Sequence, residues 1–231
     1  MIKVSGLCKQ IFDGNRHKII LNQLNFNLEK GQSAAISGES GSGKSTFLNI
    51  LGSLDKVDKG QVYISELAIH ALTSAQADNY RKKRLGIVFQ QFNLIDCLSV
   101  WDNIVFPAKL NHLPITQYHH DLVKTLGLKE HINKLPANLS GGEQQRVAMA
   151  RAMSHQPSLI LADEPTGNLD QKTSKIVSEL LFALCKELGI TLVVVTHSQS
   201  VASQADWQFV MNEERLLPVD GRSTQDSDTS N

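Results

Sequence analysis

The chain has 231 residues, which is enough for one α/β domain with a substantial hydrophobic core and too few for two complete domains of this kind. Lysine plus arginine equals aspartate plus glutamate at 23 each, so the net charge is zero and nothing favours a nucleic-acid partner. Three widely spaced cysteines predict reduced thiols rather than a disulfide framework.

The first third of the chain is predicted to be rich in β-structure. Residues 1–7, 19–28 and 62–64 have the apolar character of strands, with turns at 13–15 and 29–31. The first residues contain no continuous apolar segment of the kind that a secretion signal needs, and no apolar run is long enough to cross a bilayer. The chain is therefore expected to stay in the cytosol.

Residues 38–46, GESGSGKST, fit the phosphate-binding pattern G-x-x-x-x-G-K-[ST] between an apolar strand and a helix. The glycines let backbone N–H groups converge on phosphate oxygens, and the helix N-terminus adds partial positive charge. Lys44 is expected to reach the β- and γ-phosphates, and the Ser45 hydroxyl to ligate Mg²⁺. The expected nucleotide contacts are Gly38, Glu39, Ser40, Gly41, Ser42, Gly43, Lys44, Ser45 and Thr46. A plain glycine-serine turn is the alternative.

Two features near this loop have open interpretations. Phe12, or alternatively Ile11, lies where an apolar side chain could cover an adenine ring, although an aromatic residue at the end of an edge strand can also simply pack. Four cations at residues 81–84 are typical of a solvated face, with an anionic lipid or a partner as the alternative.

Gln90 directly follows a predicted strand at residues 85–89 and could reach a metal or a water, although a loop glutamine on the surface is the commoner case. Helical spacing at 99–110 and 116–126 then predicts a compact helical insertion. His119 and His120 are adjacent on the second of these helices, so they should point in different directions and share no metal.

Residues 139–146, LSGGEQQR, open a predicted helix at 144–153 and form a second serine- and glycine-rich helix N-terminus. This is a second candidate anion site, with an ordinary serine N-cap as the alternative.

Carboxylates follow the apolar strand predicted at 158–162. In an open parallel sheet the carboxyl ends of the strands face the ligand crevice. Asp163 could hold Mg²⁺ through water and Glu164 could polarise an attacking water, or both could cap the next helix. A further strand at 190–195 places His197 at the same edge.

Strands at 207–211 and 215–217 close the fold, and residues 220–231 should be disordered.

These segments together resemble the ATP-binding subunit of an ABC transporter over residues 1–218. The matching elements occur in the family order: the phosphate loop, Gln90, the LSGGEQQ signature, the strand ending in Glu164, Asp170 and His197. The resemblance implies a P-loop NTPase (RecA-like) α/β core with an N-terminal antiparallel β subdomain and a helical subdomain at about 91–155, followed by a tail at 219–231.

The resemblance also implies roles for these residues, with ATP and Mg²⁺ as cofactors. Gln90 becomes a Mg²⁺ and coupling residue and Glu164 the catalytic base. In the family two subunits sandwich two ATP molecules head to tail. The residues of one copy that would complete the site of the other are Ser140, Gly141 and Gly142, and Gln144 and Asp170 are also expected to bind the nucleotide. Both halves are intact here, so a homodimer would have two competent sites.

The sequences at 88–94 and 162–170 are similar to the subfamily that powers lipoprotein release, macrolide export and antimicrobial-peptide export or resistance. That similarity implies an integral membrane permease with a large external domain as partner, and a position on the cytoplasmic face of the membrane. The candidate permease groove lies near Phe89, Phe92 and Leu94. The chain departs from the family at Ser198, where aspartate is frequent, and by lacking an adenine-stacking tyrosine.

Three other functions fit these motifs less well. A soluble ABC ATPase acting in translation or DNA repair usually has two cassettes or a long heptad insertion. A P-loop kinase would lack the signature at 139–145, and a non-catalytic nucleotide sensor would be expected to have lost Glu164 or Lys44.

Overall fold

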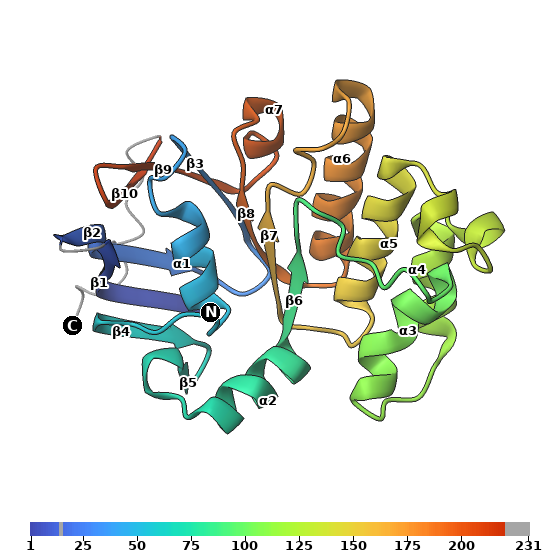
Figure 1. Cartoon of the computed structure of the whole chain (residues 1–231), viewed down its shortest axis with the longest axis horizontal. Helices are drawn as coiled ribbons and strands as arrows, with labels where there is room; N and C mark the ends of the chain where they lie inside the picture. The colour runs from blue at the N-terminus through green and yellow to red at the C-terminus, as the bar shows by residue number, and fades with distance from the viewer. Residues whose placement is uncertain (14–15, 220–231) are drawn as a thin grey trace, which may run out of the picture.

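The computed structural model describes residues 1–13 and 16–219 and places them in two β-sheets with helices around them (Figure 1). The predicted turn at 13–15 and the predicted tail at 220–231 therefore lie largely or wholly outside the described residues, as does the side chain of Phe12. No helix in the described ranges combines the length and the hydropathy that a membrane span requires.

The first sheet is antiparallel and has four strands in the order β2-β1-β4-β5. Its strands are β1 (Ile2–Asp13), β2 (Arg16–Leu28), β4 (Lys59–Ile64) and β5 (Leu67–Ala68). The prediction of a β-rich opening is confirmed, but the strand predicted at 1–7 was too short. Register shifts between Val4 and Gln10 interrupt the apolar alternation by which a strand is found in sequence, so the second half of β1 was missed.

The second sheet has six strands in the order β10-β9-β3-β8-β7-β6. The strands β9, β3, β8, β7 and β6 run parallel to one another, and β10 pairs antiparallel with β9. Its strands are β3 (Ser33–Gly38), β6 (Leu85–Val88), β7 (Leu159–Asp163), β8 (Thr191–Val195), β9 (Trp207–Asn212) and β10 (Arg215–Pro218). The α/β class and its parallel core are as predicted.

The central strands β7 and β8 separate two hydrophobic cores. Leu161 and Val193 face the core shared with the first sheet, whereas Ile160 and Val194 face the core shared with the helical region. Because successive side chains of a strand point to opposite faces, a strand that serves two cores must be apolar at every position. This requirement explains the unbroken apolar runs of both strands.

Seven α-helices surround these sheets in the described part of the chain: α1 (Lys44–Leu51), α2 (Ser74–Arg84), α3 (Val100–Leu110), α4 (Gln117–Thr125), α5 (Gly141–Met153), α6 (Gln171–Glu187) and α7 (Gln199–Ala202). Helix α1 packs against β3, β7 and β8, while α5 packs against α3 and α6. Helices α3, α4 and α5 gather beyond the β6 edge of the second sheet, at the right of Figure 1. The predicted functional motifs at 38–46, 90, 163–164 and 197 lie at or just after the carboxyl ends of the parallel strands β3, β6, β7 and β8.

Candidate active site

The loop between β3 and α1 needs glycine at two positions for reasons of conformation and space. Gly38 has a φ of 144° and Gly43 a φ of 102°, a region that L-residues rarely adopt. A Cβ at Gly43 would lie 2.9 Å from the Ile20 carbonyl oxygen, and one at Gly38 would collide with the Met211 carbonyl. The loop is thus held tightly between β2 and β9.

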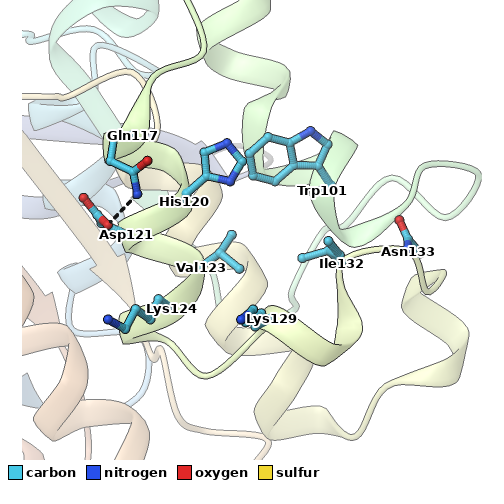
Figure 2. Close-up of a pocket in the computed structure, with 9 residues that line it drawn as sticks. All are labelled: Trp101, Gln117, His120, Asp121, Val123, Lys124, Lys129, Ile132 and Asn133. Atoms are coloured by element: carbon cyan, nitrogen blue, oxygen red, sulfur yellow. Dashed lines mark hydrogen bonds between the residues drawn. The ribbon is translucent and has the colours of Figure 1, made fainter.

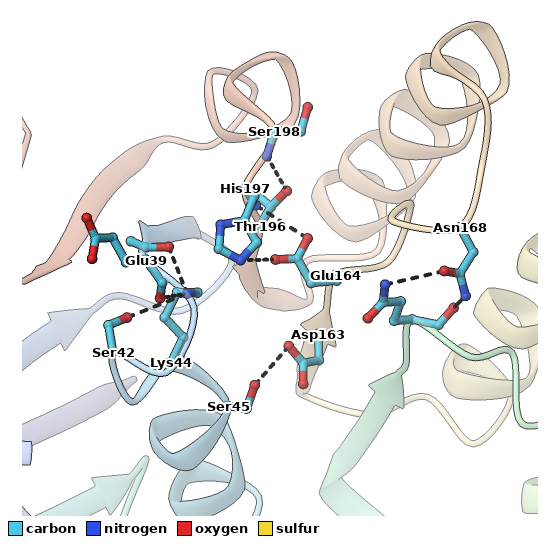
Figure 3. Close-up of polar contacts among 12 residues, drawn as sticks. Glu39, Ser42, Lys44, Ser45, Asp163, Glu164, Asn168, Thr196, His197 and Ser198 are labelled. Carbon is cyan, nitrogen blue, oxygen red and sulfur yellow. Dashed lines mark hydrogen bonds and ion pairs between the residues drawn. The ribbon is translucent and has the colours of Figure 1, made fainter. Parts of the chain in front are cut away.

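The ammonium group of Lys44 lies inside this loop (Figure 3). Its Nζ donates to the carbonyl oxygens of Gly38 at 2.8 Å and Glu39 at 2.6 Å, and approaches the Ser42 hydroxyl at 3.5 Å. The pKa of Lys44 is lowered by burial, and the nearby Glu164 and Asp163 carboxylates offset only part of that shift. The side-chain nitrogen lies at the centre of a loop suited to bind an anion.

Oxygen and amide groups suited to a hard cation lie beside the loop. The Ser45 hydroxyl is 3.4 Å from Asp163 Oδ1, and Gln90 lines the same cavity. In the described residues no group of three or more His, Cys, Asp or Glu could hold a metal by itself. A hydroxyl, one carboxylate and one amide suit Mg²⁺, which keeps several waters and takes further ligands from phosphates.

Glu164 occupies a strained backbone position at the end of β7. Its φ is 46°, which is unusual for a residue with a side chain, and its N–H donates to the Val195 carbonyl at 2.9 Å. One carboxylate oxygen accepts the His197 N–H at 3.3 Å, and the other lies 3.3 Å from His197 Nε2. Burial raises the pKa of Glu164, and the hydrogen bond from the His197 backbone and the His197 charge oppose that rise.

One cavity of about 400 Å³ brings most of the predicted catalytic and phosphate-binding residues together. Its lining includes Ser40, Gly41, Gly43, Lys44, Ser45, Thr46, Gln90, Asp163, Glu164 and His197. Ile11, Lys18 and Ile20 of the β1–β2 hairpin close one side. Of the two side chains considered for the adenine ring, Ile11 lines this cavity, whereas the Phe12 side chain lies outside the described residues.

The signature segment lies at the start of α5. Ser140 is the N-cap residue of the helix, and Gln144 Nε2 donates to the Leu139 carbonyl at 3.1 Å. A Cβ at Gly142 would lie 2.5 Å from Thr173 Cγ2, so this glycine lets α5 approach α6. Ser140, Gly141, Gly142 and Gln144 are not among the residues that line the phosphate cavity. A single chain does not bring the two motifs together.

Asp170 and Ser198 have local hydrogen-bonding roles. Asp170 caps α6 by accepting from the N–H groups of Lys172 and Thr173, each at 3.1 Å. Ser198, the departure noted above, pairs its hydroxyl with that of Ser200 at 2.9 Å, and its N–H donates to the Thr196 hydroxyl at 3.0 Å.

Asn168 and Gln145, two amide residues with no role predicted from the sequence, fix the loops around the cavity. Asn168 and Gln90 bond reciprocally: Asn168 Nδ2 donates to the Gln90 carbonyl at 3.0 Å, and Gln90 Nε2 lies 3.3 Å from Asn168 Oδ1. The fully buried Gln145 donates to the carbonyls of Phe89 and Pro165 and so joins the loops after β6 and β7. Its role could have been suspected from the sequence, because Gln145 is a polar residue on the otherwise apolar, buried face of α5.

The two adjacent histidines separate as predicted. His119 is buried and its Nδ1 accepts the Thr116 N–H at 3.2 Å, whereas His120 stacks on Trp101 with ring centroids 4.8 Å apart. Figure 2 shows His120 and Trp101 at one side of a second cavity, of about 650 Å³, between α4 and residues 129–133. The two imidazoles therefore serve different surroundings.

A third hollow, of about 550 Å³, lies beside part of the surface predicted to contact the permease. It is lined by Phe89, Phe106, Leu110 and Arg151, but not by Phe92 or Leu94. Phe92 instead lies near Gly141, and Leu94 packs against the core of the helical region. Residues 89–94 do not continue β6, so these neighbours in sequence diverge in space, and the permease contact stays a prediction.

Comparison with known proteins agrees with this arrangement. Residues 21–167 match the family described as ABC transporter. The chain is 40% identical to a lipoprotein-releasing system ATP-binding protein, LolD, of Treponema denticola, and the match covers 95% of this chain and 98% of that protein.

Solved structures lead to the same family. The dimeric structure of MJ0796, a bacterial ABC transporter cassette, is 38% identical, with a TM-score of 0.84 over 94% of this chain and 96% of that one. A post-hydrolysis state of the same cassette, bound to ADP and Pi, is 37% identical, also with a TM-score of 0.84 over the same shares. The protein described here therefore belongs to the ABC transporter family, as an ATP-binding subunit that hydrolyses ATP.

Proposed function

We propose that this subunit works as a homodimer on the cytoplasmic face of the cell membrane and powers an integral membrane permease whose cargo is a lipoprotein, a peptide or a macrolide-like molecule. The observation that carries this proposal is the end-to-end similarity to a relative named for lipoprotein release, together with an intact phosphate loop, signature and Glu164 in one chain. A soluble ABC ATPase that serves no permease is the alternative.

The proposed reaction is in-line attack of water on the γ-phosphate of ATP. Glu164 acts as general base. Its pKa is raised, which suits that role because a base is most effective when its pKa lies near the working pH. Lys44, His197 and the partner copy's Ser140 stabilise charge on the transferring group. Ser45, Gln90 and, through water, Asp163 would hold Mg²⁺, which would supply positive charge to the phosphates.

The proposed closure of the dimer follows from the division of the site between copies. Ser140, Gly141, Gly142 and Gln144 lie outside the phosphate cavity of their own chain, so we assign them to the nucleotide of the second copy, near Asp170. ATP then contacts both copies, and hydrolysis removes the contacts of its γ-phosphate. Closure and reopening would move the attached permease.

The hollow around Phe89, Phe106 and Leu110 is our candidate for the permease contact. Phe106 and Leu110 are among the exposed large hydrophobic residues. The lining also contains Arg81, Lys82 and Arg151 and one carboxylate, Asp78, which pairs with Arg81, so its net charge is positive. An amphipathic cytoplasmic helix with an apolar face and acidic residues would suit this lining. The helices α3, α4 and α5 form the helical subdomain that we propose for residues 91–155.

A pull-down from native membranes tests the proposal. Tagged Glu164→Gln protein is solubilised in gentle detergent with ATP, and the proteins that copurify are identified by mass spectrometry. We expect enrichment of a permease with a large external domain. Enrichment of a ribosomal or DNA-repair complex with no membrane protein would overturn the transport assignment and favour the soluble alternative.

A further inference from the structure

The carboxylate of Glu143 connects the start of α5 with the loop at residues 129–134. Its Oε2 accepts both the N–H and the O–H of Ser140, each at 2.7 Å. Its other oxygen, Oε1, lies 3.1 Å from His131 Nε2. The side chains of Glu143 and His131 are largely buried, with 22% and 20% of their surface exposed. The carboxylate is thus held from two sides.

His131 is itself fixed, because its loop is tied to the first turn of α3. The N–H groups of Val100 and Trp101 donate to the carbonyls of Lys134 and Ile132, each at 2.9 Å. Helix α3 would otherwise leave these N–H groups without intrahelical partners. Trp101 and Ile132 are also two of the side chains around the cavity in Figure 2. The position of Glu143 is therefore set by α3 as well as by α5.

This arrangement occupies the only proton of the Ser140 hydroxyl. Hydrogen bonds to an ionised acceptor are shorter and about twice as strong as neutral ones, so the Glu143 carboxylate competes well for that proton. A carboxylate in the first turn of α5 also offsets the partial positive charge that would attract a phosphate. Ser140 can donate to a phosphate oxygen only after its hydroxyl leaves Glu143.

We propose that Glu143, fixed by His131, is a positioning residue that holds the Ser140 hydroxyl away from the γ-phosphate of ATP on the second copy, and so sets how much ATP closes the dimer. This inference rests on the proposed function, in which Ser140 acts on the nucleotide of the partner copy. Glu143 does not line the phosphate cavity of its own chain, and the effect that we assign to it acts through Ser140.

The test adds Glu143→Gln to the Glu164→Gln protein and measures dimer formation against ATP concentration by light scattering. Glutamine can replace glutamate in the capping box, so α5 keeps its N-terminus while the negative charge is lost. We expect the half-saturating ATP concentration to fall about threefold, the size of effect that a charge near a helix N-terminus produces. Glu130→Gln removes an exposed charge from the same loop and should leave the value unchanged.

Two comparisons separate positioning from a general effect of charge. Binding of a fluorescent ATP analogue to the monomer should be unchanged by Glu143→Gln, because Ser140 acts only across the dimer. In a Ser140→Ala background, Glu143→Gln should lose most of its effect, since the hydroxyl that it releases is gone. An equal shift with and without Ser140, or an equal shift from Glu130→Gln, would overturn the proposal.

If the Glu164→Gln protein does not dimerise with ATP, the proposed function itself is contradicted. A separate measurement then tests whether Ser140 engages the Glu143 carboxylate. Hydrogen bonds from Ser140 hold the pKa of Glu143 below its usual range. Carbon-13 NMR titration of the Glu143 carboxylate in the Ser140→Ala protein should therefore give a higher pKa than in the parent. An unchanged titration would show that Ser140 does not engage this carboxylate.

Discussion

At the scale of single residues, two opposing effects act on the pKa of Glu164. Burial raises its pKa, and the backbone N–H and imidazole of His197 lower it. A general base must be deprotonated to act, so hydrolysis should fall as pH drops through a value above that of a free glutamate. In His197→Ala the loss of the imidazole should move this acid limb further upward. A coupled assay of kcat/KM against pH for both proteins checks the direction, and coincident limbs would contradict it.

The same residue supports a prediction about rate. Glu164→Gln keeps the size of the side chain and a hydrogen-bond acceptor but cannot take a proton. We expect ATP binding to persist and hydrolysis to slow by about 10² to 10⁴, the usual contribution of a general base. Single-turnover phosphate release, with nucleotide binding followed separately, makes the comparison. Unchanged turnover would remove Glu164 from the chemistry.

At the scale of elements, Gly142 determines how closely α5 approaches α6. A methyl group at this position would lie 2.5 Å from Thr173 Cγ2, well inside van der Waals contact. Gly142→Ala should lower the free energy of unfolding by about 1–3 kcal/mol, as overpacking usually does. Thr173→Ser removes that methyl and should restore much of the stability in the double variant. Thermal unfolding of the parent, the two single variants and the double variant tests this. If the stability losses of the single variants simply add in the double variant, the clash is refuted.

The apolar hollow on the helical region gives a second prediction at this scale. A charge at Phe106, which is 41% exposed, should weaken a docked permease helix because a carboxylate would enter an apolar contact. We expect Phe106→Glu to reduce stimulation of ATPase activity by the permease in proteoliposomes. Leu188→Glu, an exposed leucine that does not line the hollow, is the control. Full stimulation of the Phe106 variant would move the contact elsewhere.

Some elements were predictable because their signals are local. The strand at 158–162 and the glycine-rich loop at 38–46 are bounded by residues whose backbone or capping preferences end one element and start the next. The extension of β1 beyond Leu7 was not predictable in this way, because its irregular register is set by pairing with β2. The approach of Phe92 to Gly141 was not predictable for a related reason, because Gly141 lies in the signature segment, far away in sequence.

At the scale of the whole molecule, the parallel sheet explains why so much of the candidate site could be found from sequence. The strands β3, β7 and β8 run in one direction, so the residues that follow them meet at one edge whatever lies between them in the chain. The reciprocal bonds of Gln90 with Asn168 could not be found, because each residue alone is an ordinary loop amide. Such pairs depend on how two loops settle against each other.

The left-handed backbone of Glu164 implies a conflict between durability and turnover. A residue with a side chain held at a φ of 46° loses about 1–3 kcal/mol of stability relative to relaxed backbone. Asparagine accepts this conformation far more readily than glutamine, although both remove the base. The Glu164→Asn protein should therefore melt at a higher temperature than Glu164→Gln while being equally inactive. Every active copy would then have a lower free energy of unfolding because of its catalytic residue. Selection for hydrolysis would keep glutamate at this position, whereas selection for stability alone would replace it.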